Sequence, residues 1–346
     1  MNERLAQTVL PLIEPDDLVW VQDFHLIPLG KELRGAGVKN RLGFYLHTPW
    51  PPRRLLTTLP EAMVLVENLF EYDVIGFQTN EWLEAFCEYA VSQMGAQIEG
   101  DVLRRGGRSV RLLACPVGID ADGFAEIARS EAAQESLGRI RRSLVGRALI
   151  VGVDRLDYAK GLEERFLGYE RLLVDHPEMR NRVVFLQIAP PSRASIDSYQ
   201  RIRASLEQLT GRINGAYAAL DWVPVRYVNQ GYPHDTLAGV YRASRVGLVT
   251  PLRDGMNLVA KEYVAAQDPD DPGVLILSRF AGAAEQMKDA LLVNPYSAEE
   301  IGDALKQALE MPLAERQERW QSMMAQIREQ NVFWWLDTFH EALAAA

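Results

Sequence analysis

Cysteine is scarce in this sequence of 346 residues: Cys87 and Cys115 are the only two, and both lie among apolar neighbours. Two isolated thiols exclude a disulfide framework and a cysteine-rich metal site, and they are typical of a reducing, cytoplasmic compartment. The five histidines are scattered, which argues against a dedicated metal cage. No apolar run approaches the roughly 20 residues that cross a membrane, and no signal-peptide pattern opens the sequence, so no membrane partner is expected.

An excess of basic residues is also lacking. Lys and Arg number 37 against 47 Asp and Glu, which gives a formal net charge of −10. The two signs are interspersed without a basic tract, so a nucleic-acid partner is not expected. A chain of this length exceeds the size at which a single core keeps growing, and we therefore expect two lobes.

Apolar runs of strand length alternate with helical patterns, which predicts an α/β fold with parallel sheets covered on both faces. The predicted strands are 17–22, 41–47, 74–77 and 110–115 in a first lobe, and 149–153, 183–188, 223–228, 246–249, 273–277 and 290–293 in a second. Helices are predicted at 29–34, 61–70 and 81–94, and a polar helical stretch at 126–142 leads to the second lobe. We predict domains over 1–140 and 141–320 and a terminal helical segment over 321–346.

The stretch 249–262 carries the strongest functional signal. An apolar run is followed by a turn at Gly255 and a helical pattern from about Met256. This arrangement leaves unpaired backbone N–H groups and the positive end of a helix dipole where an anion can bind. A diphosphate there would place a sugar near Asp254 and a ribose near Glu262, which we expect two helical turns further on and on the face of Gly255. The alternative is an ordinary Asp-Gly surface turn with a solvated glutamate.

A second cluster, 153–161, also follows an apolar run and precedes a helical pattern. Arg155 and Lys160 therefore lie in a strand-to-helix loop at the carboxyl end of a predicted parallel strand, where ligands bind in open α/β sheets. Two cations at this spacing can bracket a diphosphate. The alternative is that Arg155 pairs with Asp154 or Asp157 on the surface.

Several sequence motifs, spread over almost the whole chain, carry a resemblance to a known family. They are WVQDFH (20–25), GFYLHTPWP (43–51), YDVIGFQT (72–79), RLDYAKG (155–161), QIAPPSR (187–193), GRING (211–215), TPLRDGMNLVAKEY (250–263), SRFAGAAE (278–285) and VNPY (293–296). In this order they resemble the retaining glycosyltransferases of family 20 that make trehalose 6-phosphate from UDP-glucose and glucose 6-phosphate. The resemblance implies a GT-B fold, with two Rossmann-like domains facing a cleft and the terminal segment crossing back to the first.

The resemblance also implies roles for individual residues. The donor-binding residues would be Arg155, Lys160, Tyr232, Asp254, Gly255, Met256, Asn257, Leu258 and Glu262. The acceptor-binding residues would be Asp23 and Arg193, with Arg193 on the phosphate. His47 would bind the donor glucose near C6, and with Asp254, Arg155 and Lys160 it forms the expected catalytic set. Retention in this family is attributed to front-face attack, which requires no cofactor and no metal.

Several of these assignments have a structural alternative. Asp23 could cap the following turn, and Tyr232 could anchor its loop instead of lying against the uracil. We interpret His25 as a core histidine with a structural role. The acceptor could be glycerol 3-phosphate or a cyclitol phosphate, as in sister enzymes, and a non-catalytic regulatory homologue is a further alternative. Homo-oligomerisation is left open.

Only residues 1–16 precede the first predicted strand. By resemblance, a strand and a glycine-rich loop that caps the donor would come before it. We therefore expect the first domain to be incomplete, its sheet to have an uncovered edge, and transfer by this chain to be weak.

Overall fold

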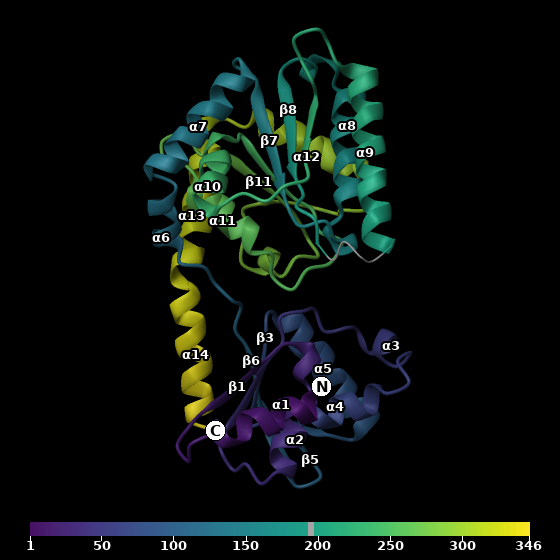
Figure 1. The fold of residues 1–346 in the computed structure, drawn as a ribbon, viewed down its shortest axis with the longest axis vertical. Coiled ribbons are helices and arrows are strands. Elements are labelled where there is room, and N and C mark those ends of the chain that lie inside the picture. The colour runs from purple at the N-terminus through teal and green to yellow at the C-terminus, as the bar shows by residue number, and fades with distance from the viewer. Residues whose placement is uncertain (193–196) are drawn as a thin grey trace. The chain divides into compact units, whose positions relative to one another are not determined.

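The computed structural model describes residues 1–192 and 197–346, and these divide into two compact units. Unit 1 comprises Met1–Val117 and Val332–Ala346, and unit 2 comprises Gly118–Asn331. Each unit contains its own six-stranded sheet (Figure 1).

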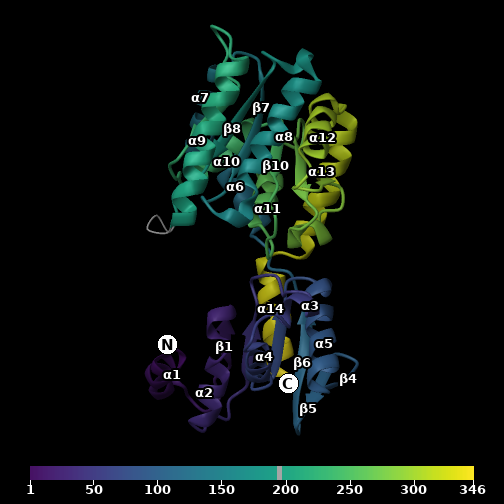
Figure 2. The same ribbon diagram turned by 90° about the vertical axis from the view of Figure 1, so that its right-hand side faces the viewer.

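The sheet of unit 1 has the strand order β1-β2-β3-β6-β5-β4 (Figure 2). Its strands are β1 (Val19–Gln22), β2 (Leu42–Tyr45), β3 (Val74–Phe77), β4 (Gln97–Glu99), β5 (Val102–Arg105) and β6 (Arg108–Ala114). The helices are α1 (Asn2–Val9), α2 (Leu29–Gly35), α3 (Arg53–Leu56), α4 (Ala62–Leu69), α5 (Asn80–Met94) and α14 (Val332–Ala344). The first four strands in this order are parallel, whereas β5 and β4 extend the sheet antiparallel. We did not predict the β4–β5 pair, because the three residues of β4 are all exposed and show no alternation.

The last helix, α14, packs on the strands of unit 1 through aromatic side chains. Phe339 stacks on Trp20 with ring centroids 4.3 Å apart. A Cβ atom at Gly43 would lie 2.7 Å from the Phe339 ring, and one at Gly76 would lie 2.9 Å from it. The two glycines of the buried strands β2 and β3 therefore leave the space that this helix fills.

The sheet of unit 2 has the order β12-β11-β10-β7-β8-β9, and all of its named pairs are parallel. The strands are β7 (Ala148–Val153), β8 (Val183–Ile188), β9 (Val225–Val228), β10 (Val246–Val249), β11 (Val274–Ser278) and β12 (Leu291–Val293). The helices are α6 (Ala121–Ile127), α7 (Glu131–Leu144), α8 (Leu162–Asp175), α9 (Asp197–Tyr217), α10 (His234–Ala243), α11 (Leu258–Ala266), α12 (Ala298–Glu310) and α13 (Leu313–Glu329). Figure 1 shows α8 and α9 on one side of the strands and α7 and α10 on the other. The predicted α/β class with parallel-dominated sheets is confirmed.

The boundaries between the units differ from the predicted ones. Residues 118–140 belong to unit 2 because α6 and α7 pack against α10 and α11. The hydroxyl of Ser136 donates to the carbonyl of Thr236 at 3.0 Å, and a Cβ atom at Gly239 would lie 2.2 Å from the carbonyl oxygen of Ala133. Residues 321–331 also belong to unit 2, since α13 continues unbroken through position 320 and buries Met323.

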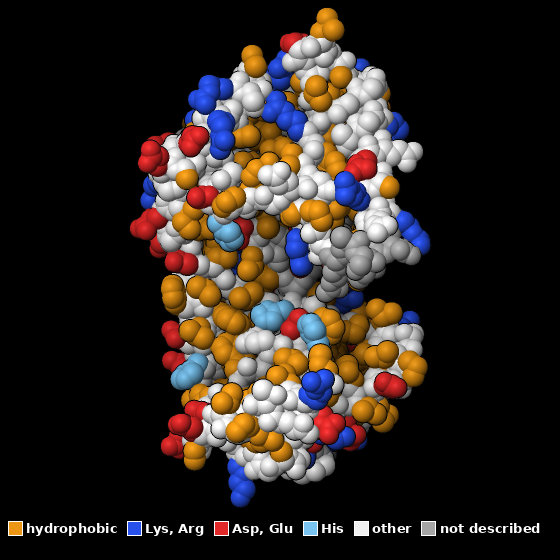
Figure 3. All heavy atoms as spheres, viewed as in Figure 1, with side chains coloured by type: hydrophobic (Ala, Val, Ile, Leu, Met, Phe, Trp, Pro, Cys, Tyr) orange, Lys and Arg blue, Asp and Glu red, His pale blue; other side chains and the backbone are white. Residues whose placement is uncertain are grey.

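The surface mixes the two signs of charge, as the sequence indicated. On the face that Figure 3 shows, acidic and basic side chains are interspersed over both units. Among the helices of the described residues, none combines the length and the apolar character needed to span a bilayer.

Candidate functional site

The loop between β10 and α11 forms the first part of the candidate site. Helix α11 begins at Leu258 rather than at Met256, because Asn257 takes a left-handed conformation with φ 71° and caps the helix. The side-chain oxygen of Asn257 accepts from the N–H of Ala260 at 3.3 Å. Gly255 and Met256 therefore lie in the loop, and Glu262 is one turn into the helix rather than two. The prediction that Gly255 shares a helical face with Glu262 is wrong.

The backbone of this loop is held by the segment that follows β11. The N–H of Asp254 donates to the carbonyl of Phe280 at 3.1 Å, and the N–H of Ala283 donates to the carbonyl of Met256 at 2.9 Å. In the part of the chain that the structure describes, no backbone acceptor is recorded for the N–H groups of Gly255 and Leu258. The loop thus has a fixed path and N–H groups that remain available to an anion.

Lys160 joins this loop to the loop after β7. Its ammonium group lies 2.6 Å from a carboxylate oxygen of Asp254, and the same oxygen accepts from the side-chain amide of Asn257 at 3.0 Å. The N–H of Leu252 donates to the carbonyl of Ala159 at 2.8 Å, which ties the two backbones together. The structure therefore brings Lys160, Asp254 and Asn257 into one cluster, although 94 positions separate Lys160 from Asp254 in the chain.

Electrostatics fix the charge of this cluster. Burial acts to lower the pKa of Lys160, but the carboxylates of Asp154 and Asp254 outweigh it, and the pKa is raised above its usual value. Lys160 therefore stays cationic at neutral pH. It is a fixed positive charge at the end of a parallel strand, where a diphosphate would need one.

Arg155 is exposed and extends the positive charge of the same loop. The carboxylate of Asp157 accepts from the N–H of Ala159 at 3.0 Å, and that of Asp154 accepts from Arg165 at 2.7 Å. Within residues 1–192 and 197–346, no ion pair is recorded between Arg155 and either aspartate, so the surface pair that we considered as an alternative is not observed.

Glu262 and Tyr232 lie at the edges of this region. Glu262 is partly buried, and burial raises its pKa while the charge of His234 acts in the opposite direction. Tyr232 is 37% exposed and lines a cavity of about 380 Å³ whose other walls come from α7, β8, β9 and α10. These positions are compatible with contacts to a ribose and a base, and both assignments stay predictions.

In unit 1, Asp23 directly follows strand β1 and has a strained conformation with φ 72° and ψ 161°. Such a conformation costs about 1–3 kcal/mol for a residue other than glycine and is often found at functional sites. The carboxylate makes no capping hydrogen bond to the turn that follows, and its buried Oδ1 has no partner. Among the described residues, the alternative of a capping role for Asp23 is therefore not observed.

His47 follows strand β2 and is held through both ring nitrogens. Its Nε2 lies 2.8 Å from the side-chain oxygen of Gln22, and its Nδ1 lies 3.5 Å from the amide nitrogen of Gln78. The amide oxygen of Gln78 accepts from the N–H of Val117 at 2.9 Å, which fixes the amide orientation. Gln78 then donates to Nδ1, so the proton of His47 resides on Nε2. Burial lowers the pKa of His47, which favours the same neutral form.

His25 and Arg193 are the two remaining residues for which the sequence predicted a role. The interpretation of His25 as a core histidine is wrong, because its side chain is 53% exposed and its ring stacks on Phe24 at 4.2 Å. Arg193 lies outside the described residues. The sequence reasoning missed Arg165, Gln22 and Gln78. The only signal of Gln22 and Gln78 was polarity in or directly after a strand, and that of Arg165 was a charged residue within helix α8.

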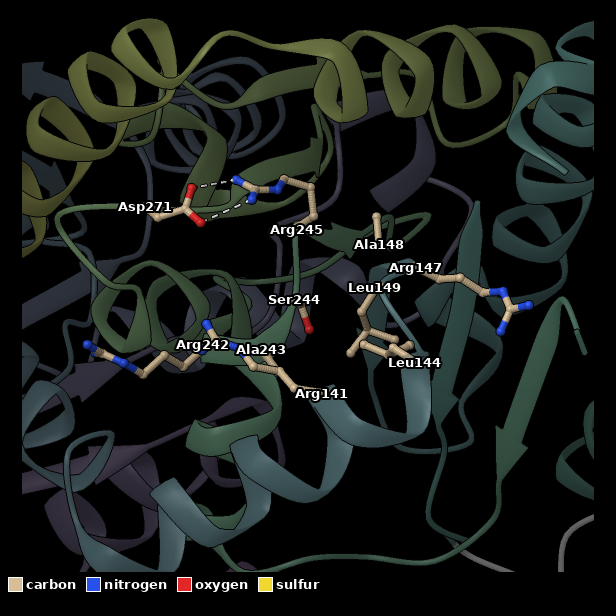
Figure 4. Close-up of a pocket in the computed structure, with 11 residues that line it drawn as sticks. Arg141, Leu144, Arg147, Ala148, Leu149, Arg242, Ala243, Ser244, Arg245 and Asp271 are labelled. Atoms are coloured by element: carbon tan, nitrogen blue, oxygen red, sulfur yellow. Dashed lines mark hydrogen bonds and ion pairs between the residues drawn. The ribbon is translucent and has the colours of Figure 1, made fainter. Parts of the chain in front are cut away.

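A separate pocket of about 550 Å³ lies near the amino ends of β7 and β10, away from the candidate loops (Figure 4). It is lined by Arg141, Arg147, Arg242 and Arg245 and by one carboxylate, that of Asp271. Arg245 pairs with Asp271 at 3.0 Å inside the pocket, whereas Arg147 and Arg242 pair with aspartates outside it. The guanidinium groups that are labelled in Figure 4 point in different directions and do not converge on one point.

Comparison with known proteins identifies the family. The model of glycosyltransferase family 20 matches residues 1–345. The trehalose-6-phosphate synthase of Sinorhizobium fredii is 48% identical over 347 aligned positions, which cover 100% of this chain and 75% of the relative. A trehalose-phosphate synthase (UDP-forming) from Burkholderia xenovorans, solved in complex with glucose-6-phosphate, is 50% identical with a TM-score of 0.96 over 99% of this chain and 76% of that one. The E. coli protein solved with UDP-2-fluoro glucose is 44% identical, with a TM-score of 0.97 over 99% of this chain and 76% of that one. The chain therefore belongs to glycosyltransferase family 20 and has the GT-B fold class of its relatives.

Proposed function

We propose that this protein is a retaining glucosyltransferase of trehalose biosynthesis. It transfers glucose from UDP-glucose to glucose 6-phosphate and forms α,α-trehalose 6-phosphate and UDP. The names of its relatives, and the glucose-6-phosphate and UDP-2-fluoro glucose in two of their structures, support this donor and acceptor. The observation in this chain that carries the proposal is the 2.6 Å contact between Lys160 and Asp254, which joins two anion-binding loops at the carboxyl edge of one parallel sheet.

The donor would be held by both loops of unit 2. Arg155 and Lys160 would bind the diphosphate together with the backbone N–H groups of residues 255–258. Asp254 would bind hydroxyl groups of the glucose, Glu262 would bind the ribose, and Tyr232 would lie against the uracil. Asp254 neutralises Lys160, so a diphosphate bound at Lys160 would share this cation with Asp254, whose carboxylate also accepts from the side-chain amide of Asn257.

The chemistry would consist of positioning and charge stabilisation. The bond between the anomeric carbon and the β-phosphate oxygen breaks, and a bond forms from that carbon to the hydroxyl oxygen of the acceptor on the same face. The proton of that hydroxyl passes to the departing phosphate oxygen. Arg155, Lys160 and the loop N–H groups stabilise the negative charge that develops on the diphosphate. No side chain of the enzyme needs to form a covalent intermediate.

On the acceptor side, Asp23 would accept from sugar hydroxyls, and Arg193 would bind the phosphate. The neutral His47 would face the donor glucose, which requires that the sugar compete with Gln22 for the Nε2 proton. In this proposal the enzyme needs no resident cofactor or metal, acts in the cytoplasm, and contributes to osmoprotection by making the phosphorylated precursor of trehalose.

The test measures binding and transfer on one sample of the chain. Thermal melting is followed against increasing UDP, and product formation is followed with UDP-glucose and either glucose 6-phosphate or glycerol 3-phosphate. We expect a melting shift that grows with the logarithm of UDP concentration above the dissociation constant, and weak transfer that prefers glucose 6-phosphate.

Each arm can fail separately. The absence of a UDP-dependent shift would remove the donor assignment from unit 2. A shift with preferred transfer to glycerol 3-phosphate would assign the chain to a sister activity. A shift without transfer to either acceptor would favour a regulatory homologue that retains the nucleotide-sugar site.

A further inference from the structure

Arg165 is a completely buried arginine that connects three neighbouring strands of unit 2. It lies on α8, and its guanidinium group donates to the carboxylate of Asp154 at 2.7 Å, to the amide oxygen of Gln187 at 3.0 Å and to the hydroxyl of Thr250 at 3.1 Å. Asp154 follows β7, Gln187 is in β8 and Thr250 follows β10. One side chain therefore contacts the carboxyl edge of β10, β7 and β8, from which both candidate loops begin.

The local sequence leaves room for this group. A Cβ atom at Gly152 would lie 2.6 Å from a guanidinium nitrogen of Arg165 and 2.5 Å from the amide oxygen of Gln187. A glycine inside a buried strand weakens the strand unless something else needs the space. A buried ion pair is often no more stable than a well-packed apolar replacement, so stability alone does not explain a buried arginine with a carboxylate and three neutral acceptors, the third being the carbonyl of Lys160 at 3.4 Å.

The contacts of Arg165 lead directly to Lys160. One carboxylate oxygen of Asp154 binds Arg165, and the other lies 3.8 Å from the ammonium group of Lys160, which in turn contacts Asp254. If Asp154 lost its arginine, Lys160 would be its nearest remaining cation in the described structure and would be drawn toward it, away from Asp254. Thr250 ties the same arginine to the start of the loop that carries Asp254.

We infer that Arg165 is a positioning residue that sets the geometry of the diphosphate-binding cluster. It fixes Asp154, so that Lys160 remains directed at Asp254, and it holds the loops after β7 and β10 in register. This inference rests on the proposed function, since it assigns Lys160 to the diphosphate of the donor. It predicts that the loss of Arg165 affects ligands with a diphosphate more than ligands with a single phosphate.

The test compares Arg165→Lys with the unchanged protein and with Arg212→Lys. Lysine keeps the charge but cannot reach three acceptors at once. Arg212 is the control, because its guanidinium group also binds a carboxylate, that of Glu170 at 2.6 and 2.8 Å, but its side chain is 49% exposed on the same unit. For each protein, the melting shift is measured with UDP and with UMP, and kcat and KM are measured for UDP-glucose and glucose 6-phosphate.

In Arg165→Lys we expect the UDP shift to fall to the size of the UMP shift, while the UMP shift is kept. We expect kcat to fall by about 10²-fold, the loss that a misplacement of about 1 Å can cause, with the KM for glucose 6-phosphate unchanged. Arg212→Lys should match the parent protein in every measurement.

Other results would overturn the inference. A folded Arg165→Lys that keeps the UDP shift and turnover would show that the arginine is only structural, and so would an equal loss of both shifts. If Arg165→Lys does not fold, Thr250→Val tests the inference instead, because it removes one hydrogen-bond acceptor of Arg165 and keeps nearly the same side-chain shape. Thr250→Val should lower kcat and the UDP shift but not the UMP shift, and parental behaviour would overturn the inference. Failure of the proposed function would appear instead as the absence of a UDP shift in the parent protein.

Discussion

Replacing Lys160 by alanine should reduce glucosyl transfer by about 10²–10³-fold, equivalent to about 2.7–4 kcal/mol, the range for losing one charge-stabilising donor. The structural reason is the position of the ammonium group, 2.6 Å from Asp254 and 3.8 Å from Asp154. It is the cation through which the two loops meet. Without it, the diphosphate would approach two carboxylates with the exposed Arg155 as its main counter-charge.

The same substitution should also lower stability. The contact with Asp254 is a charge-assisted hydrogen bond between side chains that are 16% and 18% exposed, and bonds of this kind contribute about 1.5–3 kcal/mol. The two carboxylates raise the pKa of Lys160 above its usual 10.5. Its contribution to stability is therefore fully present below pH 10.5 and is lost only as the pH rises through the higher folded-state pKa. Assays near neutral pH are free of this titration.

The assay measures kcat and KM at a temperature well below the melting transition of the variant. Lys306→Ala serves as the control, because Lys306 also contacts two carboxylates, Glu178 at 3.2 Å and Glu310 at 3.0 Å, on α12. We expect the control to keep normal turnover. If Lys160→Ala melted at a lower temperature but kept near-normal turnover, Lys160 would be structural and the proposed diphosphate clamp would be wrong.

Two further predictions concern other parts of the chain. Arg193→Ala should raise the KM for glucose 6-phosphate and leave UDP-glucose binding almost unchanged, because its charge would face the acceptor phosphate; an equal loss for both ligands would contradict this role. A hydrogen bond from Arg245, together with one from Arg316, lowers the pKa of the Asp271 carboxyl group from 3.8 to about 2. The ionised carboxylate therefore stabilises the fold above pH 3.8, and this stabilisation is lost as the pH falls toward 2. Urea denaturation should therefore find Asp271→Asn less stable than the parent near neutral pH, with a difference that shrinks between about pH 4 and pH 2; a difference independent of pH would refute this.

The strands of unit 2, and with them the loops that follow the strands, were predictable because the sequence patterns that define them are local. Val183–Ile188 and Val246–Val249 were predicted with the bounds that the structure has, since continuous apolar runs between helical patterns define buried parallel strands. The start of α11 was not, because the left-handed conformation of Asn257 depends on the loop around it, and sequence periodicity carries no information on that φ angle. The boundary between the units was misplaced for a similar reason. A helix such as α7 shows its amphipathic period in the sequence but not the sheet against which it packs.

Two of the residues that the sequence did not reveal, Gln78 and Arg165, share one physical feature: they are polar, buried, and act on another residue. Gln78 is 1% exposed and orients the ring of His47 in unit 1, and Arg165 is completely buried and fixes Asp154 beside Lys160 in unit 2. In each case a residue that a ligand would contact is held by a neighbour that it would not reach. A short polar motif at the end of a strand therefore indicates the residue that contacts a ligand. The residues that hold it in place come from adjacent strands and helices and can be identified only in the folded structure. Because low dielectric strengthens such buried bonds and penalises their loss, these supports should be as sensitive to substitution as the residues they position.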